Sequence, residues 1–403
     1  MTNPLSAETI ALVRASVPAL TEHGALITQA MYGRLFKDAH IRALFNHSNQ
    51  GPNGEQVHAL AAAVLGFAQN IENLDALAPV VERIAQKHIG YHILPEHYPY
   101  VARAILGALQ DVLGEAATPD LLSAWGDAFW CLADILKTRE MEIRRDICSS
   151  RGGWDGWRPF RVEGKTRESS VIQSFVLRPA DGQAVVTHRP GQYLTLQLER
   201  PGADPLKRNY SISCAPNGES YRISVKREPL GFASRWLHDE ITEGDIVLVT
   251  PPAGDFFLPD LPERPVVLLS GGVGLTPMIS MVETIAAKHP QLEAHFVHGT
   301  TNSETHAMAA HVRALSVRHG NIRVATFYCD PLDRDAVGRS HDMNGFITED
   351  WLRANTPLLD ADVYLCGPKP FLRVFVKALS RAGVPSSRVH YEFFGPADEL
   401  LAA

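Results

Sequence analysis

Long hydrophobic runs are missing from this sequence of 403 residues. No apolar stretch approaches the roughly 20 residues needed to cross a bilayer, so a membrane-spanning helix is not expected. The segment Met1–Ser6 also has neither the basic nor the apolar region of a secretory signal. These two absences predict a soluble, cytoplasmic protein.

Paired cysteines and a basic surface are equally lacking. The five cysteines are odd in number and far apart, and none forms a CxxC pair, so neither a disulfide framework nor a zinc site is predicted. The formal net charge is −7, and charges of both signs are mixed along the chain without the basic stripe that neutralises phosphates. Nucleic acid is therefore not an expected partner.

What the sequence contains is three successive patterns, which agree with a prior of roughly 100–200 residues per domain. In residues 1–150 the apolar positions recur at helical spacing, which predicts an all-α domain. Ser6 is expected to cap the first helix, and Pro18 is expected to kink or end it.

Residues 151–262 carry a β pattern. The stretch Gly152–Trp157 breaks the helical spacing, and alternation with period two follows in Tyr193–Glu199 and Tyr221–Lys226. Pro190-Gly191 and Pro216-Asn217-Gly218 are typical turn sequences. This region is predicted to be a small antiparallel β-barrel.

Residues 263–403 change pattern again. Val266–Leu269 is apolar throughout, as a strand buried on both faces would be, and a helical stretch follows at Thr276–Ala287. Similar short runs recur at His295–Val297, Val324–Tyr328 and Val363–Cys366. The alternation of buried strands with helix-length segments predicts a doubly wound α/β domain with a parallel sheet.

One histidine of the helical domain lies on an apolar face. Val81, Ile84 and His88 share one side of a predicted helix, which directs the imidazole toward the core. From this pattern alone, a hydrogen-bonded core histidine is the better interpretation than a metal ligand.

The helical domain resembles the globin part of flavohaemoglobins. The matching phrases are Leu44-Phe45-Asn46, Gln69–Glu72, Ile84–His88 and Ser123–Gly126. The resemblance implies that His88 is the proximal ligand of haem iron, which needs a neutral nitrogen donor.

The same resemblance implies a distal pocket. Tyr32 and Gln56 would face bound dioxygen, and Phe45 and Leu60 would pack against the haem. Tyr32 would donate a hydrogen bond to that dioxygen. The alternative is a half-buried helix tyrosine whose hydroxyl reaches water.

On the proximal side, Tyr98 and Glu140 match positions that form hydrogen bonds around the proximal imidazole in this family. A carboxylate partner makes the imidazole more basic, and electron-rich ligation favours oxygen activation over simple carriage. The alternative is that Glu140, within Arg139–Glu142, is one of several charges on a solvated helix face.

The β region resembles the flavin domain of the ferredoxin reductase family. Arg208-Asn209-Tyr210-Ser211 matches the RxYS element, in which Arg neutralises the flavin pyrophosphate, Tyr lies against the isoalloxazine and Ser binds near the reactive nitrogen. Pro190–Tyr193 also matches the family, so Tyr193 is a candidate flavin contact.

A second phosphate-binding turn is indicated by Gly231–Ser234, with Gly231 and Ser234 as its candidate residues. Pro229-Leu230 stands where glycine is expected, and proline removes a donor and fixes φ. The phosphate contacts at this turn therefore stay open.

The nucleotide domain carries the reductase family's GGxGxTP loop, with Gly271, Gly272, Gly274, Thr276 and Pro277 as candidate residues. It follows a strand and opens a helix, and Pro277 distinguishes it from the dehydrogenase G-x-G-x-x-G loop.

Two further elements belong to the nicotinamide side and to the end of the chain. Cys366-Gly367-Pro368 matches the family's nicotinamide element, and in Tyr391–Pro396 the resemblance puts Phe394 over the flavin and Glu392 near its ring. The alternative for Cys366 is a small buried strand residue.

Taken together, the resemblance implies a nitric oxide dioxygenase with haem b, FAD and NAD(P)H, acting on NO and O2. A hydride donor delivers two electrons and haem iron accepts one, so a flavin between them is the physical converter. Two alternatives stay open: an oxygen- or NO-binding globin with a haem-maintaining reductase, and a general reductase of ferric, quinone or lipid hydroperoxide acceptors.

Some properties are not fixed by the sequence. His298–Ser303 offers neither an acid for a ribose nor an Arg pair for a 2′-phosphate, so the choice between NADH and NADPH stays open. A monomer is expected, and lipid in the haem pocket is a further open possibility.

Overall fold

A computed structural model describes residues 5–45, 63–200 and 203–394. The chain divides into two compact units. One comprises the residues through Ser149 together with Glu199–Lys207, and the other comprises Ser150–Leu198 and Arg208–Phe394.

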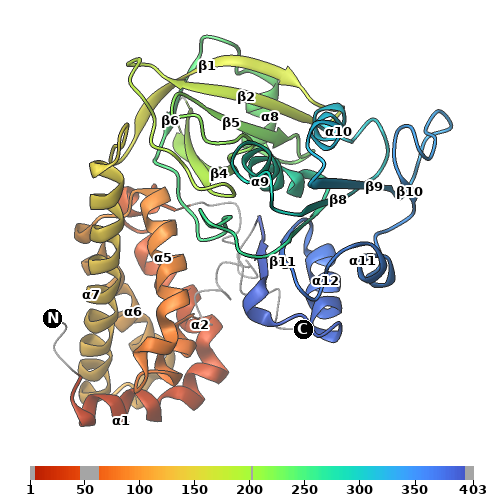
Figure 1. Ribbon diagram of the computed structural model, residues 1–403. Coiled ribbons are helices and arrows are strands. Elements are labelled where there is room, and N and C mark those ends of the chain that lie inside the picture. The colour runs from red at the N-terminus through yellow and green to blue at the C-terminus, as the bar shows by residue number, and fades with distance from the viewer. Residues whose placement is uncertain (1–4, 46–62, 201–202, 395–403) are drawn as a thin grey trace. The chain divides into compact units, whose positions relative to one another are not determined.

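The first unit is helical, as predicted (Figure 1). Within it, α2 packs on α6, and both α1 and α5 pack on α7. Its helices are α1 (Ala7–Ala15), α2 (Val17–Leu35), α3 (Ala39–Arg42), a helix over residues 63–69, α5 (Ala78–Tyr91), α6 (Tyr98–Leu113) and α7 (Pro119–Ser149), with short 3-10 turns at Leu74–Leu77, Pro95–His97 and Gly114–Ala116.

The start of the chain folds as its sequence predicts. The Ser6 hydroxyl accepts a hydrogen bond from the Thr9 amide at 3.0 Å and so caps α1. The helix ends at Ala15, and Pro18 occupies the first turn of α2, where its missing N–H costs nothing. Trp125 of α7 is buried in the core and donates to the Ser16 hydroxyl at this junction, 3.2 Å away.

Two sheets follow the helices, and the first is antiparallel in the order β4-β3-β6-β1-β2-β5. Apart from Glu199–Lys207, at the end of β3 and the start of β4, the residues of both sheets belong to the second unit. Ile212, just beyond β4, pairs with Ile223 of β5, so the two edges of the sheet meet and the barrel closes. Its elements are β1 (Arg158–Arg167), β2 (Ile172–Pro179), β3 (Tyr193–Arg200), β4 (Ala203–Ser211), β5 (Tyr221–Lys226), α8 (Phe232–Asp239) and β6 (Ile246–Val249).

The second sheet is parallel, in the order β10-β9-β8-β7-β11-β12. Helices α9 and α10 lie on one face and α11 and α12 on the other (Figure 1), which is the doubly wound fold predicted. Its elements are β7 (Val266–Gly271), α9 (Leu275–Lys288), β8 (Ala294–Thr300), α10 (Ala309–Arg318), β9 (Ile322–Tyr328), β10 (Met343–Asn344), α11 (Glu349–Asn355), β11 (Asp362–Cys366), α12 (Lys369–Arg381) and β12 (Val389–Glu392), with 3-10 turns at Gly272–Gly274 and Ser386–Arg388.

The strand order reverses between β7 and β11, and ligands of such sheets bind at the carboxyl ends of the strands on either side of that reversal. Val266, Val267, Leu268 and Leu269 of β7 are fully buried, which explains their unbroken apolar run. Among the described residues, no helix combines the length and apolar character that a bilayer span requires.

Candidate functional sites

Three helices bring His88, Tyr98 and Glu140 together in the helical unit. His88 Nδ1 lies 2.6 Å from Glu140 Oε1, and the Tyr98 hydroxyl donates to the same oxygen at 2.5 Å. Tyr98 Oη is 3.2 Å from His88 Nδ1. Because an ionised carboxylate only accepts hydrogen bonds, the imidazole carries its proton on Nδ1. The Nε2 atom is then the neutral donor that an iron ligand requires.

Burial determines the character of this cluster. Glu140 is 2% exposed, so it is not a charge on a solvated helix face. Burial and the neighbouring Glu140 carboxylate raise the pKa of Tyr98 well above its ordinary value, which keeps the phenol protonated as a donor. His88 is half-buried, with 28% of its side chain exposed, as a residue facing a cofactor pocket would be.

Tyr32 lies on α2 beside two phenylalanines. Its ring stacks on Phe36 at 5.3 Å between centroids and meets Phe45 edge-on at 5.9 Å. The residue is 8% exposed, which argues against a half-buried tyrosine in water, and burial raises its pKa to about 12. Its hydroxyl makes no hydrogen bond to any described residue, so a protonated donor is available to a ligand. Gln56 and Leu60 lie outside the described residues.

The RxYS segment Arg208–Ser211 forms the end of β4, next to β3. The Thr195 hydroxyl of β3 donates to the Asn209 amide oxygen at 3.0 Å, so Asn209 fixes the strand pair. Burial raises the pKa of Tyr210 above its ordinary value. Tyr193 begins β3 and is joined to Ala253 by a backbone hydrogen bond of 2.9 Å.

In the second predicted phosphate turn, the Ser234 side chain forms hydrogen bonds within the turn itself. The Ser234 hydroxyl accepts from the Glu228 amide at 3.0 Å and donates to the Gly231 carbonyl at 3.2 Å. Gly231 is the N-cap of α8, and no side chain caps the amides of the first turn. Leu230, where glycine was expected, is 99% exposed.

The glycine-rich loop joins β7 to α9 at the switch point of the parallel sheet. A Cβ on Gly274 would lie 2.1 Å from the Cys366 carbonyl oxygen, so only glycine lets the loop close against β11. The Thr276 hydroxyl donates to the Val273 carbonyl at 3.0 Å, and Pro277 lies in the first turn of α9. Gly271 ends β7, and Gly272 has a φ of 54°, which glycine adopts readily in a tight turn.

Cys366 ends β11, directly before Gly367, and is paired in register with Ser270 of β7 and Glu392 of β12. The thiol is fully buried, and burial raises its pKa well above the ordinary value, so it is not a reactive thiolate. Phe394 is 49% exposed beyond β12, an unusual position for a phenylalanine unless another group covers it.

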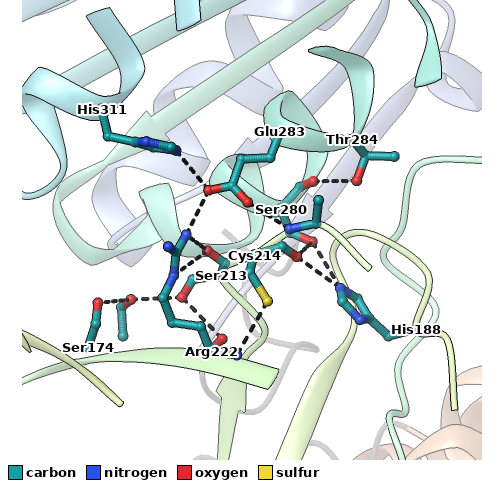
Figure 2. A network of polar contacts seen from close by, with 11 residues as sticks. Ser174, His188, Ser213, Cys214, Arg222, Ser280, Glu283, Thr284 and His311 are labelled. Atoms are coloured by element: carbon teal, nitrogen blue, oxygen red, sulfur yellow. Dashed lines mark hydrogen bonds and ion pairs between the residues drawn. The ribbon is translucent and has the colours of Figure 1, made fainter. Parts of the chain in front are cut away.

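One set of contacts within the second unit was not predicted from the sequence. Ser280 and Glu283 of α9 contact the loop that follows β4 (Figure 2). Their i, i+3 spacing on α9 puts them on one helix face, but neither residue belongs to a recognisable sequence pattern.

Two family models match the chain. The globin model matches residues 29–136, and the model of the oxidoreductase NAD-binding domain matches residues 268–377. Both lie where the helical unit and the parallel sheet were found.

Full-length relatives and solved structures extend this similarity. A flavohemoprotein of Xylella fastidiosa (strain 9a5c) is 55% identical over 403 residues, covering 100% of both chains. A flavohemoprotein of Halalkalibacterium halodurans is 41% identical over 410 residues, again covering 100% of both. The crystal structure of flavohemoglobin from Malassezia yamatoensis with bound FAD and heme is 25% identical, has a TM-score of 0.86 and covers 98% of this chain and 100% of its own.

The reductase part has a separate counterpart. The FAD/NAD binding domain of nitric oxide dioxygenase from Vibrio cholerae is 39% identical, with a TM-score of 0.54, covering 59% of this chain and 99% of its own. Identity over the whole length of both chains, with the globin and the reductase in one polypeptide, shows that this chain belongs to the flavohemoprotein family.

Proposed function

We propose that this chain is an NAD(P)H-dependent nitric oxide dioxygenase, which combines NO with O2 to give nitrate. The observation that carries the proposal is the contact of His88 with the buried Glu140 carboxylate at 2.6 Å, in a chain that also contains its own reductase. When bound, haem supplies the iron at which NO and O2 react, and FAD divides the electron pair of a hydride into single electrons.

His88 is the proposed iron ligand through Nε2, and Glu140 and Tyr98 contact its other ring nitrogen, Nδ1. The hydrogen bond from Nδ1 to a buried carboxylate makes the imidazole electron-rich and fixes its orientation. Tyr98 shares the same carboxylate oxygen and limits the charge that Glu140 transfers to the ring. Electron-rich ligation supports oxygen chemistry better than reversible oxygen carriage.

On the other side of the proposed haem pocket, Tyr32 holds a proton in apolar surroundings. Phe36 and Phe45 pack on its ring and exclude water from it. With its pKa at about 12, the phenol donates a hydrogen bond at neutral pH and does not ionise. Gln56 and Leu60 complete this pocket in the proposal.

The reductase residues bind and orient the two nucleotides. Arg208, Tyr210 and Ser211, with Tyr193 beside them, are proposed to hold FAD, helped by Asn209 and by the α8 turn at Gly231–Ser234. The loop Gly271–Pro277 and the segment Cys366-Gly367 are proposed to hold NAD(P)H, with Glu392 and Phe394 at the flavin ring. Because the loop opens a helix and carries no side chain at Gly272, where an added Cβ would meet no atom within 4 Å, its amides can approach a pyrophosphate closely.

We also propose the domain limits 1–150, 151–262 and 263–403. The first limit falls between the end of α7 at Ser149 and the start of β1 at Arg158. The second falls between β6, which ends at Val249, and β7, which begins at Val266. A cytoplasmic, monomeric protein remains part of the proposal, and the free state of all five cysteines agrees with a reducing compartment.

The experiment is to measure NADH oxidation, NO consumption and nitrate formation together, using haem- and FAD-loaded protein in oxygenated buffer. NO, O2 and one electron make nitrate, so each NADH should yield two nitrates over many turnovers. An NO- or O2-binding globin would stop after one stoichiometric reduction. A general reductase would oxidise NADH with ferric, quinone or hydroperoxide acceptors and form no nitrate.

A further inference from the structure

A polar network within the reductase unit is centred on Glu283 of α9, whose side chain is 13% exposed (Figure 2). Its Oε1 accepts from Arg222 Nη2 at 2.8 Å and lies 2.8 Å from His311 Nε2. Its Oε2 accepts from the Ala215 amide at 2.7 Å. One carboxylate thus joins α9, strand β5, helix α10 and the loop after β4, which we call the Glu283 network.

The charge of Glu283 is well compensated. Burial by itself would raise its pKa, but the hydrogen bond from His311, the Arg222 guanidinium and the Ala215 amide outweigh burial and lower it. Glu283 is therefore ionised at neutral pH, and all three donors point at it. Removing the charge while keeping the side-chain shape leaves these three donors without a full set of acceptors.

A second side chain of α9, that of Ser280, forms a hydrogen bond to the same loop after β4. The Ser280 hydroxyl donates to the Cys214 carbonyl at 2.7 Å. His188 Nε2 lies 3.0 Å from that carbonyl oxygen, and since a carbonyl only accepts, Nε2 carries the proton. Ser280 is fully buried and His188 nearly so, which excludes water from this contact.

The loop itself is firmly attached to the barrel. The Ser213 amide donates to the Arg222 carbonyl at 2.7 Å, and the Arg222 Nε atom donates back to the Ser213 carbonyl at 2.9 Å. The Ser213 hydroxyl meets Ser224 at 2.7 Å, and Ser224 meets Ser174 of β2 at 2.8 Å. Movement of residues 213–215 therefore requires movement of the barrel strands.

The two ends of this connection lie beside the two proposed nucleotide sites. Ser213 follows the proposed flavin residue Ser211 by two positions in the chain. Ser280 and Glu283 lie on the helix whose first turn contains the proposed nicotinamide residues Thr276 and Pro277. A rigid helix on one side and a hydrogen-bonded strand end on the other fix the distance between the two sites.

We propose that Glu283 and Ser280 are positioning residues that hold the nicotinamide loop in register with the flavin segment for hydride transfer. The hydride carries both electrons and one proton from the dihydronicotinamide ring to the flavin, so the nicotinamide is oxidised as the flavin is reduced. This inference rests on the proposed use of NAD(P)H and FAD. A misplacement of about 1 Å between donor and acceptor can cost on the order of 100-fold in rate.

The test is anaerobic stopped-flow reduction of the bound flavin by NADH, comparing Glu283→Gln with the unaltered chain. We expect flavin reduction to slow about 10- to 100-fold, while the NADH concentration at half-maximal rate changes less than about 3-fold, because Glu283 contacts neither proposed nucleotide segment directly. A second readout, independent of turnover, is the long-wavelength charge-transfer absorbance that appears when NAD⁺ is added to the chemically reduced protein. This absorbance should weaken in the variant.

Glu349→Gln is the matched control. Glu349 of α11 accepts hydrogen bonds from Arg353 and Arg381 in the same parallel-sheet region, at 3.0 Å and 3.1 Å, and neither arginine lies in the barrel. This variant should leave both readouts unchanged. If Glu283→Gln does not fold, Ser280→Ala takes its place, with the same expected direction and a smaller effect.

Unchanged flavin reduction and unchanged charge-transfer absorbance in the folded variant would overturn the inference. An equal loss in the Glu349→Gln control would also overturn it, because the effect would then be one of general stability. The assay contains neither NO nor O2, so it stands apart from the dioxygenase proposal. Slowed reduction in a protein that forms no nitrate would support the inference and contradict only the dioxygenase function.

Discussion

The Tyr98 hydroxyl donates to Glu140 Oε1 at 2.5 Å, on the same oxygen that lies 2.6 Å from His88 Nδ1. The His88 and Tyr98 donors compete for one carboxylate oxygen, and this competition sets the electron density of the imidazole. Glu140 increases its electron density, and Tyr98 moderates that increase by drawing on the same lone pairs.

Neutralising Glu140 should therefore weaken the proposed iron ligand. In Glu140→Gln we expect nitrate turnover to fall about 10- to 100-fold, as for other partners behind metal-bound histidines. The iron–histidine stretching frequency of the reduced protein, measured by resonance Raman spectroscopy, should drop with it. Glu142→Gln is the control, because Glu142 lies on the same helix but binds Arg139 at the surface. A stretching frequency equal to that of the unaltered protein would contradict the prediction.

On the dioxygen side of the proposed haem pocket, opposite His88, we expect substitution of Tyr32 to reduce turnover the most. Tyr32→Phe keeps the ring among Phe36 and Phe45 and removes only the hydroxyl, so the fold should be retained. Loss of a single preorganised donor costs on the order of 100-fold in turnover, and O2 should dissociate faster in flash photolysis. Tyr100→Phe, which keeps the ring under Arg103, should change neither quantity. Unaltered O2 dissociation in Tyr32→Phe would remove Tyr32 from the proposed site.

Gly274 should tolerate no side chain. In Gly274→Ala the new methyl group would overlap the backbone of Cys366, so the loop must move away from the end of β11. We expect the KM for NADH to rise about 10-fold or more and the unfolding free energy to fall by about 1–3 kcal/mol, with FAD content unchanged. Gly320→Ala is the control, since nothing lies within 4 Å of its added methyl. A variant with a normal KM would exclude close packing of this loop as a condition for nucleotide binding.

The stability of the reductase unit should depend on pH through His188. Burial lowers its pKa to about 4 from an ordinary value of 6.5, so the unfolded chain takes up a proton at a higher pH than the folded one. The free energy of unfolding is therefore unaffected by this group above about pH 6.5. As the pH falls from there toward 4, protonation of His188 in the unfolded chain lowers it by about 3 kcal/mol. Urea unfolding at pH 8, 6 and 5 measures it.

His188→Gln is the variant for this prediction. It should lower stability at pH 8 by removing a buried hydrogen bond, yet it should flatten the decline between pH 6.5 and 5. An equally steep decline in the variant would assign the pH dependence to other groups.

Sequence patterns predicted those elements whose burial repeats along the chain. The run Val266–Leu269 identified β7 because a central parallel strand is buried on both faces. Strand β4 was not predicted, because it contains Asp204, Pro205 and Lys207 and no alternation of apolar residues. It is the first strand of the sheet order, and the bridge that closes the barrel lies just beyond its end at Ile212, so proline is tolerated within it as in an edge strand.

The sites divide in the same way. The glycine-rich loop is contiguous in sequence, so its residue types suffice to predict it. Glu140 lies far from His88 in the chain, and from periodicity alone it could equally be a surface charge. Family resemblance proposed the pair, and the fold brought it within 2.6 Å. The contacts of Glu283 with Arg222 and Ala215 have no sequence signal, because they depend on how two sheets meet.

The register of β7 has a consequence for the order in which the chain acquires its structure. Val266 is paired on one side with Ala294 but on the other with Asp362, which leaves the ribosome about 100 residues later. Until then, β7, which is buried along its whole length in the folded protein, has one open edge, and parallel pairing across such a distance is slow. The helical unit through Ser149 has by then been synthesised in full. We therefore expect nascent chains to contain a folded first domain attached to an aggregation-prone intermediate. Chaperone binding should be needed most in the interval before β11 has been synthesised.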